Sequence, residues 1–229
     1  SRTFSDGGGV IFKSTDGKNF EKKYTITNGL RTEITTSQAN AGTVYVLVQM
    51  NSESNPVGIL KTTDDFTSVN DLSLPNDADT GIPATDFTRG QSFYDLLIKV
   101  DPNDENTIYV GGIDLFKSTN GGSSWEQLSH WYGGFGKQNV HADQHGLAFA
   151  SSSRMVFGND GGVYFSNNAG TDIRARNNNY NTLQFYTIGV APTSVFDGKE
   201  YFLAGAQDNG TQLIICLLYT SDAADETEG

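Results

Sequence analysis

All three histidines of the chain lie in one segment, residues 130–145. His141, Asp143 and His145 alternate with other residues, so in an extended strand their side chains would share one face. Imidazole and carboxylate groups on one face can bind a divalent metal ion. They can equally hydrogen-bond to neighbouring backbone, and this second role is expected because no fourth ligand is evident. We therefore predict no metal or other cofactor, and keep these residues as the metal candidates.

Aromatic side chains begin the same segment. Trp131, Tyr132 and Phe135 stand among glycines, which let a loop adapt its shape. Aromatic faces suit sugar rings, and aromatic residues are also frequent at protein interfaces. The predicted binding residues for a carbohydrate or protein ligand are Trp131, Tyr132, Phe135, His141, Asp143 and His145.

Acids beside glycine recur in three short stretches, residues 5–9, 159–162 and 207–210. Asp-Gly and Asn-Gly pairs are ordinary hairpin turns, and this structural role is the main expectation. Hydrolysis of glycosides, however, needs two carboxyl groups across a cleft. Asp160 and Asp208 are therefore the candidate catalytic residues, although catalysis is expected less than binding.

The elements that position these residues follow from a turn motif that occurs four times, at a spacing of about 50 residues. Asp and Asn bond back to the backbone of their own turn, and glycine reaches positive φ. The motif residues are accordingly expected to be structural: Ser14, Asp16, Phe20, Thr62, Asp64, Ser118, Asn120, Gly122, Trp125, Ser166, Asn168 and Gly170.

The motif resembles the Asp-box, or BNR repeat, of sialidases, xyloglucan-cleaving endoglucanases, sortilin-type receptors and many secreted bacterial proteins. The resemblance implies an all-β fold, a β-propeller of four-stranded antiparallel blades, and places the chain closest to uncharacterised secreted bacterial BNR proteins. A sialidase would need an arginine cluster for the substrate carboxylate, and the arginines here do not form the family's motif. The predicted function is an extracellular or cell-surface module that binds glycan or protein, with a glycoside hydrolase as the alternative.

Alternation and turn residues predict the strands. The inner strands are expected at 30–36, 93–100, 146–150 and 184–190, each followed by three further strands except the last. The chain should thus hold three whole blades and two partial ones, with the remaining blades missing. In such blades the Asp-boxes lie at one end, and propellers generally bind ligands at the other end, where residues 130–145, Asp160 and Asp208 are expected.

The C-terminal residues 216–229 break the repeat pattern. They back-translate into a string that resembles a transposon-end sequencing adapter, so we expect residues 1–215 to be an incomplete Asp-box propeller from a metagenomic fragment and 216–229 to be a non-native tail.

The charge of the chain bears on its partners. The formal net charge is −12, and four of the 27 acidic residues lie in the tail, which leaves 23 against 15 Lys and Arg. An acidic chain without basic clusters argues against nucleic acid as a partner. No apolar run approaches the length of a membrane span, so membrane insertion is not expected, and any signal peptide would lie upstream.

Overall fold

A computed structural model describes residues 8–180, 184–192, 194, 200–207 and 210–216. The chain forms two compact units, Ser1–Asn178 and Asn179–Gly229. Asp208 lies outside the described residues, as do Ser5–Gly7 and residues 217–229 of the expected tail. The predicted boundary at residue 216 therefore stays a prediction.

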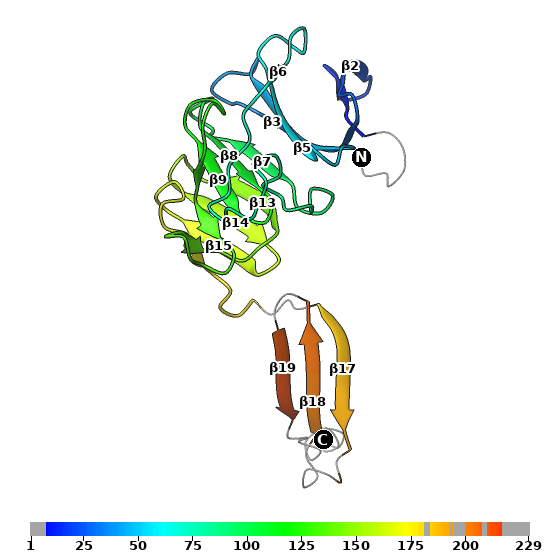
Figure 1. Cartoon of the computed structure of the whole chain (residues 1–229), viewed down its shortest axis with the longest axis vertical. Helices are drawn as coiled ribbons and strands as arrows, with labels where there is room; N and C mark the ends of the chain where they lie inside the picture. The colour runs from blue at the N-terminus through cyan, green and yellow to red at the C-terminus, as the bar shows by residue number, and fades with distance from the viewer. Residues whose placement is uncertain (1–7, 181–183, 193, 195–199, 208–209, 217–229) are drawn as a thin grey trace, which may run out of the picture. The chain divides into compact units, whose positions relative to one another are not determined.

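Apart from one short parallel pair, the first unit consists of antiparallel sheets in which consecutive strands are neighbours (Figure 1). Three of them have four strands each, as expected for propeller blades, and the all-β fold class is confirmed. Their strands are β3 (Gly29–Thr36), β4 (Val44–Met50), β5 (Val57–Thr62) and β6 (Asn70–Asp71); β7 (Leu97–Val100), β8 (Ile108–Gly111), β9 (Leu115–Ser118) and β10 (Glu126–Gln127); and β13 (Gln144–Phe149), β14 (Met155–Asn159), β15 (Gly162–Ser166) and β16 (Arg174–Ala175). A hairpin of β1 (Val10–Lys13) and β2 (Glu21–Thr25) precedes them.

Apolar side chains fill the spaces between successive sheets. Ile11 and Ile26, on either side of the β1–β2 hairpin, pack with Val46 of β4; Tyr45 and Ile59 pack with Phe116 of the next sheet; and Tyr109 packs with Phe157 of the sheet after that. Each four-stranded sheet thus shares a buried core with the sheet that precedes it, which fixes the order of blades in this unit.

The four motif copies form the turns at the ends of β1, β5, β9 and β15. In the third copy, Ser118 Oγ accepts from the amides of Asn120 at 3.3 Å and Gly122 at 2.9 Å, and Asn120 Oδ1 accepts from the amide of Ser124 at 2.9 Å. The fourth copy repeats this pattern from Ser166. In the second copy Phe66 takes the place of glycine and adopts a φ of 66°.

The last aromatic residue of the motif is only partly buried in the first and third copies. Trp125 is half-buried and donates from Nε1 to the Ser73 carbonyl at 2.7 Å, whereas Phe20 is 64% exposed. Trp125 therefore joins two neighbouring sheets, because Ser73 belongs to the segment that follows β6.

Two features depart from the expected strands. The inner strand β7 begins at Leu97 rather than Phe93, because the amides of Tyr94 and Asp95 both bond back to the Gln91 carbonyl in a turn. The connection after β10 carries a parallel pair, β11 (Ser129–His130) with β12 (Gln138–Asn139), which pattern analysis did not anticipate. Both features lie beside the candidate site residues.

The second unit contains one three-stranded antiparallel sheet of β17 (Phe185–Ala191), β18 (Glu200–Ala206) and β19 (Gly210–Cys216). The first two strands match expectation, and Cys216, the first residue of the expected tail, ends β19 opposite Glu200. Several large apolar side chains of this sheet are exposed, including Ile188, Val190 and Leu203. No helix in the described part of the chain is long and apolar enough to cross a membrane.

Candidate functional site

The inner strands β3, β7 and β13 begin at the same end of the first unit. Because β14 runs antiparallel to β13, the β14–β15 turn with Asp160 also lies at this end, opposite the Asp-box turns. The turn has two residues, Asp160 and Gly161, between the paired Asn159 and Gly162. It is therefore a hairpin turn, as expected, and it also carries a carboxylate to the starts of the inner strands.

Asp160 binds side chains from two neighbouring sheets. The Tyr94 hydroxyl donates to its carboxylate at 2.9 Å and 3.1 Å, and His145 Nε2 lies 2.7 Å from Oδ1. The rings of Tyr94 and His145 meet edge to face, with centroids 4.8 Å apart. The side chains of His145 and Asp160 keep 35% and 15% of their surface exposed, so solvent and ligands reach this group.

A second pair of acids lies next to this group in the chain. Asp95 is fully buried and Asp143 is 7% exposed. Burial, reinforced by the negative charge of Asp143, raises the pKa of Asp95 to about 9. At neutral pH Asp95 is thus protonated. Arg31 acts in the opposite sense on the pKa of Asp95.

Arg31, near the start of β3, holds the segment before β7. Its guanidinium donates to the carbonyl oxygens of Phe93 at 3.3 Å and Leu96 at 3.5 Å, and also to that of Tyr94. These bonds position Tyr94 and Asp95, the two side chains of this segment that contact the predicted site residues.

The expected common face of His141, Asp143 and His145 does not form. Asp143 has a φ of 65°, which breaks the extended backbone, and β13 begins only at Gln144. His141 instead packs on Gly161, where an added Cβ would lie 2.3 Å from the imidazole. His145 therefore contacts Asp160, the charge of Asp143 raises the pKa of Asp95, and His141 packs against the hairpin turn.

The predicted aromatic residues form a cluster, which we call the aromatic platform: Trp131, Tyr132 and Phe135. Their exposed fractions are 44%, 53% and 52%, and the rings of Trp131 and Tyr132 meet edge to face at 4.7 Å. Large aromatic side chains exposed together are a feature of binding surfaces. The β11–β12 pairing joins the two ends of this loop, and Asn139 Nδ2 donates to the Trp131 carbonyl at 3.0 Å.

The buried ring of His130 supports the platform from below. Its centroid lies 4.1 Å from that of Tyr132 and 5.0 Å from that of Phe135. Arg89 Nη2 lies 3.3 Å from His130 Nε2, 2.8 Å from Asp77 Oδ2 and 3.6 Å from Asp114 Oδ2. The sequence pattern indicates no role for Arg89 or Asp77, because both lie in the irregular segment between β6 and β7.

Within the described part of the chain, two acids and the histidine of this network lie close enough together to be considered as metal ligands. One ligand atom each from Asp77, Asp114 and His130 lies within 4.8 Å of the other two. The guanidinium of Arg89 already supplies positive charge there, so the arrangement fits an ion-paired core better than a metal site. Burial, followed by repulsion from Asp77, raises the pKa of Asp114 to about 7.

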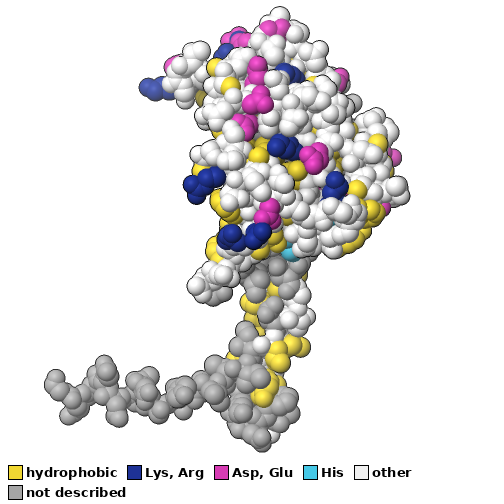
Figure 2. Space-filling model, turned by 90° about the vertical axis from the view of Figure 1, so that its left-hand side faces the viewer, with side chains coloured by type: hydrophobic (Ala, Val, Ile, Leu, Met, Phe, Trp, Pro, Cys, Tyr) yellow, Lys and Arg dark blue, Asp and Glu magenta, His cyan; other side chains and the backbone are white. Residues whose placement is uncertain are grey.

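Charged groups on the surface are mixed. On the face shown in Figure 2, acidic and basic side chains lie interspersed on the first unit. This face therefore offers no basic patch of the kind that binds nucleic acid.

The chain resembles known proteins only distantly. No protein-family model and no curated protein matches the chain. Among solved structures, the GH74 enzyme of Niastella koreensis is 18% identical with a TM-score of 0.46, over 80% of this chain and 28% of that one. The GH74 xyloglucanase from Xanthomonas campestris is 16% identical with a TM-score of 0.46, over the same shares. YCF48 from Cyanidioschyzon merolae is 13% identical with a TM-score of 0.47, over 90% and 65%. The chain thus spans between 28% and 65% of the length of these solved structures.

Proposed function

We propose that this chain is a binding module of the Asp-box propeller type, exported to the cell surface or beyond, that takes a glycan on its aromatic platform. The observation that carries the proposal is the exposure of Trp131, Tyr132 and Phe135 together, each close to half exposed, on a loop whose backbone is fixed. Apolar burial does not account for three such rings at one place, because a solvent-exposed ring gains little from folding.

The loop is built to present these rings in one arrangement. Gly133, Gly134 and Gly136 all have positive φ, the Gly133 amide donates to the His130 carbonyl at 2.8 Å, and the Lys137 amide donates to the Gly134 carbonyl at 2.8 Å. A platform that is already ordered loses less conformational entropy when a ligand binds. Ring faces on such a platform suit the C–H faces of sugars, and the neighbouring polar side chains suit their hydroxyl groups.

The experiment is a glycan array with the full 229-residue chain, followed by calorimetry on the saccharides that bind. Trp131→Ala and Tyr132→Ala should each weaken binding by about 10-fold or more, which corresponds to about 1.4 kcal/mol. Phe12→Ala is the matched control, because Phe12 is 55% exposed on β1, outside the platform, and it should leave the affinity unchanged.

Thermal melting of each variant separates loss of binding from loss of folding. Equal binding by the two platform variants and by wild type would contradict the assignment of the platform. Absence of binding to any saccharide on the array would contradict a glycan as ligand, and capture of a protein ligand that depends on Trp131 would replace it.

The hydrolase alternative rests on Asp160, the partly exposed carboxylate of the cluster with Tyr94 and His145. The mechanism needs a second carboxyl group about 6.5 to 9.5 Å away for inversion. Asp95 and Asp143 are buried, and Asp208 lies outside the described residues. A reducing-sugar assay on wild type and Asp160→Asn decides this point: turnover that the variant loses while it still binds the glycan would establish hydrolysis.

A further inference from the structure

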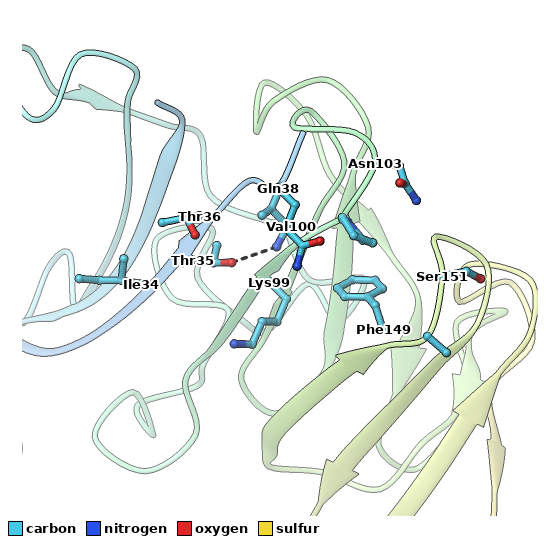
Figure 3. Close-up of a pocket in the computed structure, with 11 residues that line it drawn as sticks. Ile34, Thr35, Thr36, Gln38, Lys99, Val100, Asn103, Phe149 and Ser151 are labelled. Carbon is cyan, nitrogen blue, oxygen red and sulfur yellow. Dashed lines mark hydrogen bonds between the residues drawn. The ribbon is translucent and has the colours of Figure 1, made fainter. Parts of the chain in front are cut away.

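A cavity of about 580 Å³ opens at the other end of the inner strands (Figure 3). Its walls come from the last residues of β3, β7 and β13 and from the turns that follow them, so it lies at the Asp-box end of the first unit. The residues that define its chemistry are Ile34, Thr36, Gln38, Lys99, Asn103 and Phe149. Its volume is in the range of small-molecule sites, about 300 to 1,000 Å³.

Lys99 is the one charged side chain in the lining of this cavity. Among the described residues, the Lys99 ammonium group forms no hydrogen bond or ion pair and lies over no aromatic ring. Other lysines of the unit do have such partners: Lys13 and Lys23 pair with Asp65, and Lys61 lies over the ring of Tyr45. In a chain of net charge −12, a cavity with a single cation and no acid in its lining is a local site for an anion.

The remaining lining suits a sugar ring. Figure 3 shows Lys99 between Ile34 of β3 and Phe149 of β13. Ile34 is 43% exposed, and the ring of Phe149 is held by Tyr109, with centroids 5.7 Å apart. Gln38 and Asn103 bring amide groups, and Thr36 brings a hydroxyl group, all of which can bond to sugar hydroxyls.

Hydrogen bonds link the walls of the cavity to one another. Thr35 Oγ1 accepts from the Val100 amide at 3.3 Å, which joins β3 to β7. On the other side, Ser152 Oγ donates to Asp101 Oδ1 at 2.6 Å and accepts from Asn103 Nδ2 at 2.8 Å, which joins the turn after β7 to the turn after β13. A cavity whose walls are cross-linked in this way is preorganised, and preorganisation favours binding.

We propose that this cavity binds a uronic-acid residue of an oligosaccharide, with the sugar carboxylate on the Lys99 ammonium and the sugar ring against Phe149. The site lies at the opposite end of the unit from the aromatic platform and does not depend on it. Carboxylate–ammonium attraction gives selectivity for an acidic sugar over a neutral one, and the apolar wall gives selectivity for a sugar over a simple carboxylate.

Calorimetry on the full chain with trigalacturonic acid tests the proposal, with neutral cellotriose and with acetate as the comparison ligands. The trigalacturonate should bind at least about 10-fold more tightly than either, and its affinity should fall as salt is raised. Lys99→Gln should weaken trigalacturonate binding by about 10-fold or more, and Lys99→Arg should retain most of it.

Two matched pairs of variants control for charge and for folding. Ile34→Glu places an acid at the cavity and should weaken binding, whereas Val156→Glu, at a residue that is 42% exposed on β14, should not. Lys22→Gln on β2 removes one positive charge elsewhere and should have no effect. Trp131→Ala should leave trigalacturonate binding intact, so failure of the platform and failure of this site are distinguishable.

Three results would overturn the proposal. They are the absence of trigalacturonate binding at millimolar concentration, equal affinity for cellotriose or for acetate, and unchanged affinity in Lys99→Gln and Ile34→Glu variants that melt like wild type.

Discussion

The Nε2 atom of His145 lies 2.7 Å from Oδ1 of Asp160, although His145 comes from the inner strand β13 and Asp160 from the hairpin turn that follows the next strand, β14. The Tyr94 hydroxyl, from the turn that precedes β7 of the neighbouring sheet, donates to the same carboxylate. One carboxylate thus connects two neighbouring sheets at the end where the inner strands begin.

Replacement of this carboxylate should cost stability without unfolding the chain. Asp160→Asn keeps one acceptor oxygen and removes the charge, so we expect the free energy of unfolding to fall by about 1 to 2 kcal/mol. Urea denaturation measures it. Asp172→Asn is the control, because the Asp172 side chain is 44% exposed and pairs only with a surface arginine, and its cost should stay within about 0.5 kcal/mol. Equal costs for the two variants would show that the Asp160 contacts are not stabilising.

The close contact between Gly161 and His141 leads to a second expectation. A Cβ at residue 161 would lie 2.3 Å from the imidazole, so Gly161→Ala should displace His141 and lower stability by about 1 to 3 kcal/mol. Gly158→Ala is the matched control in the same hairpin, because no described atom lies within 4 Å of its added Cβ. Thermal denaturation of both proteins checks this, and a Gly161→Ala variant as stable as Gly158→Ala would contradict it.

The raised pKa of Asp95 predicts a dependence of stability on pH. The folded chain holds the Asp95 proton up to about pH 9, whereas the unfolded chain releases it near the ordinary value of 3.8. The contribution of this group to stability is therefore complete below about pH 4 and is lost as the pH rises toward 9, at up to about 1.4 kcal/mol per pH unit.

Asp95→Asn isolates this effect, because a carboxamide mimics the neutral acid and stays neutral. Between pH 5 and pH 9 the melting temperature of wild type should fall more than that of the variant, so the difference between them should grow with pH. Melting curves at pH 5, 7 and 9 give the answer, and a constant difference would mean that Asp95 ionises normally.

Two substitutions of Trp125 separate the contribution of its ring packing to stability from that of its hydrogen bond. Trp125→Ala should lower the free energy of unfolding by about 1 to 3 kcal/mol, less than for a fully buried ring, because Trp125 is half-buried. Trp125→Phe keeps the packing and loses only the bond from Nε1 to the Ser73 carbonyl, at a cost of about 1 kcal/mol. Glycan binding should be unchanged in both, and weakened binding at full stability would assign Trp125 to a ligand site.

The repeats made the blades predictable, since a turn motif and strand alternation are local properties. Strand ends at the Asp-box turns agree well, as at Ser118 and Ser166, because the motif itself ends the strand. The start of β7 was misplaced because Phe93 to Leu96 continue the strand alternation, while the turn that bends them depends on the Gln91 carbonyl.

The candidate site was only partly predictable for a similar reason. His145 and Asp160 were both placed at the end where the inner strands begin. Their partner Tyr94 comes from the turn before β7, and the pattern within one strand does not reveal contacts with a neighbouring segment. Arg89 was missed because its partners Asp77, Asp114 and His130 lie in three separate segments. The relevant signal was compositional: Arg89 is one of few arginines in an acidic chain and lies near several aspartates.

The short parallel pairing of β11 with β12 affects which sequence changes the loop between them can accept. It joins both ends of the loop from Trp131 to Lys137 to each other, so the backbone of this loop is closed by its own strand pairing. Substitutions and insertions at the tip are therefore separated from folding, in the way that the hypervariable loops of antibodies are separated from their framework. Related chains can acquire new specificities there, and a designed library confined to residues 131–137 should yield folded proteins with altered recognition.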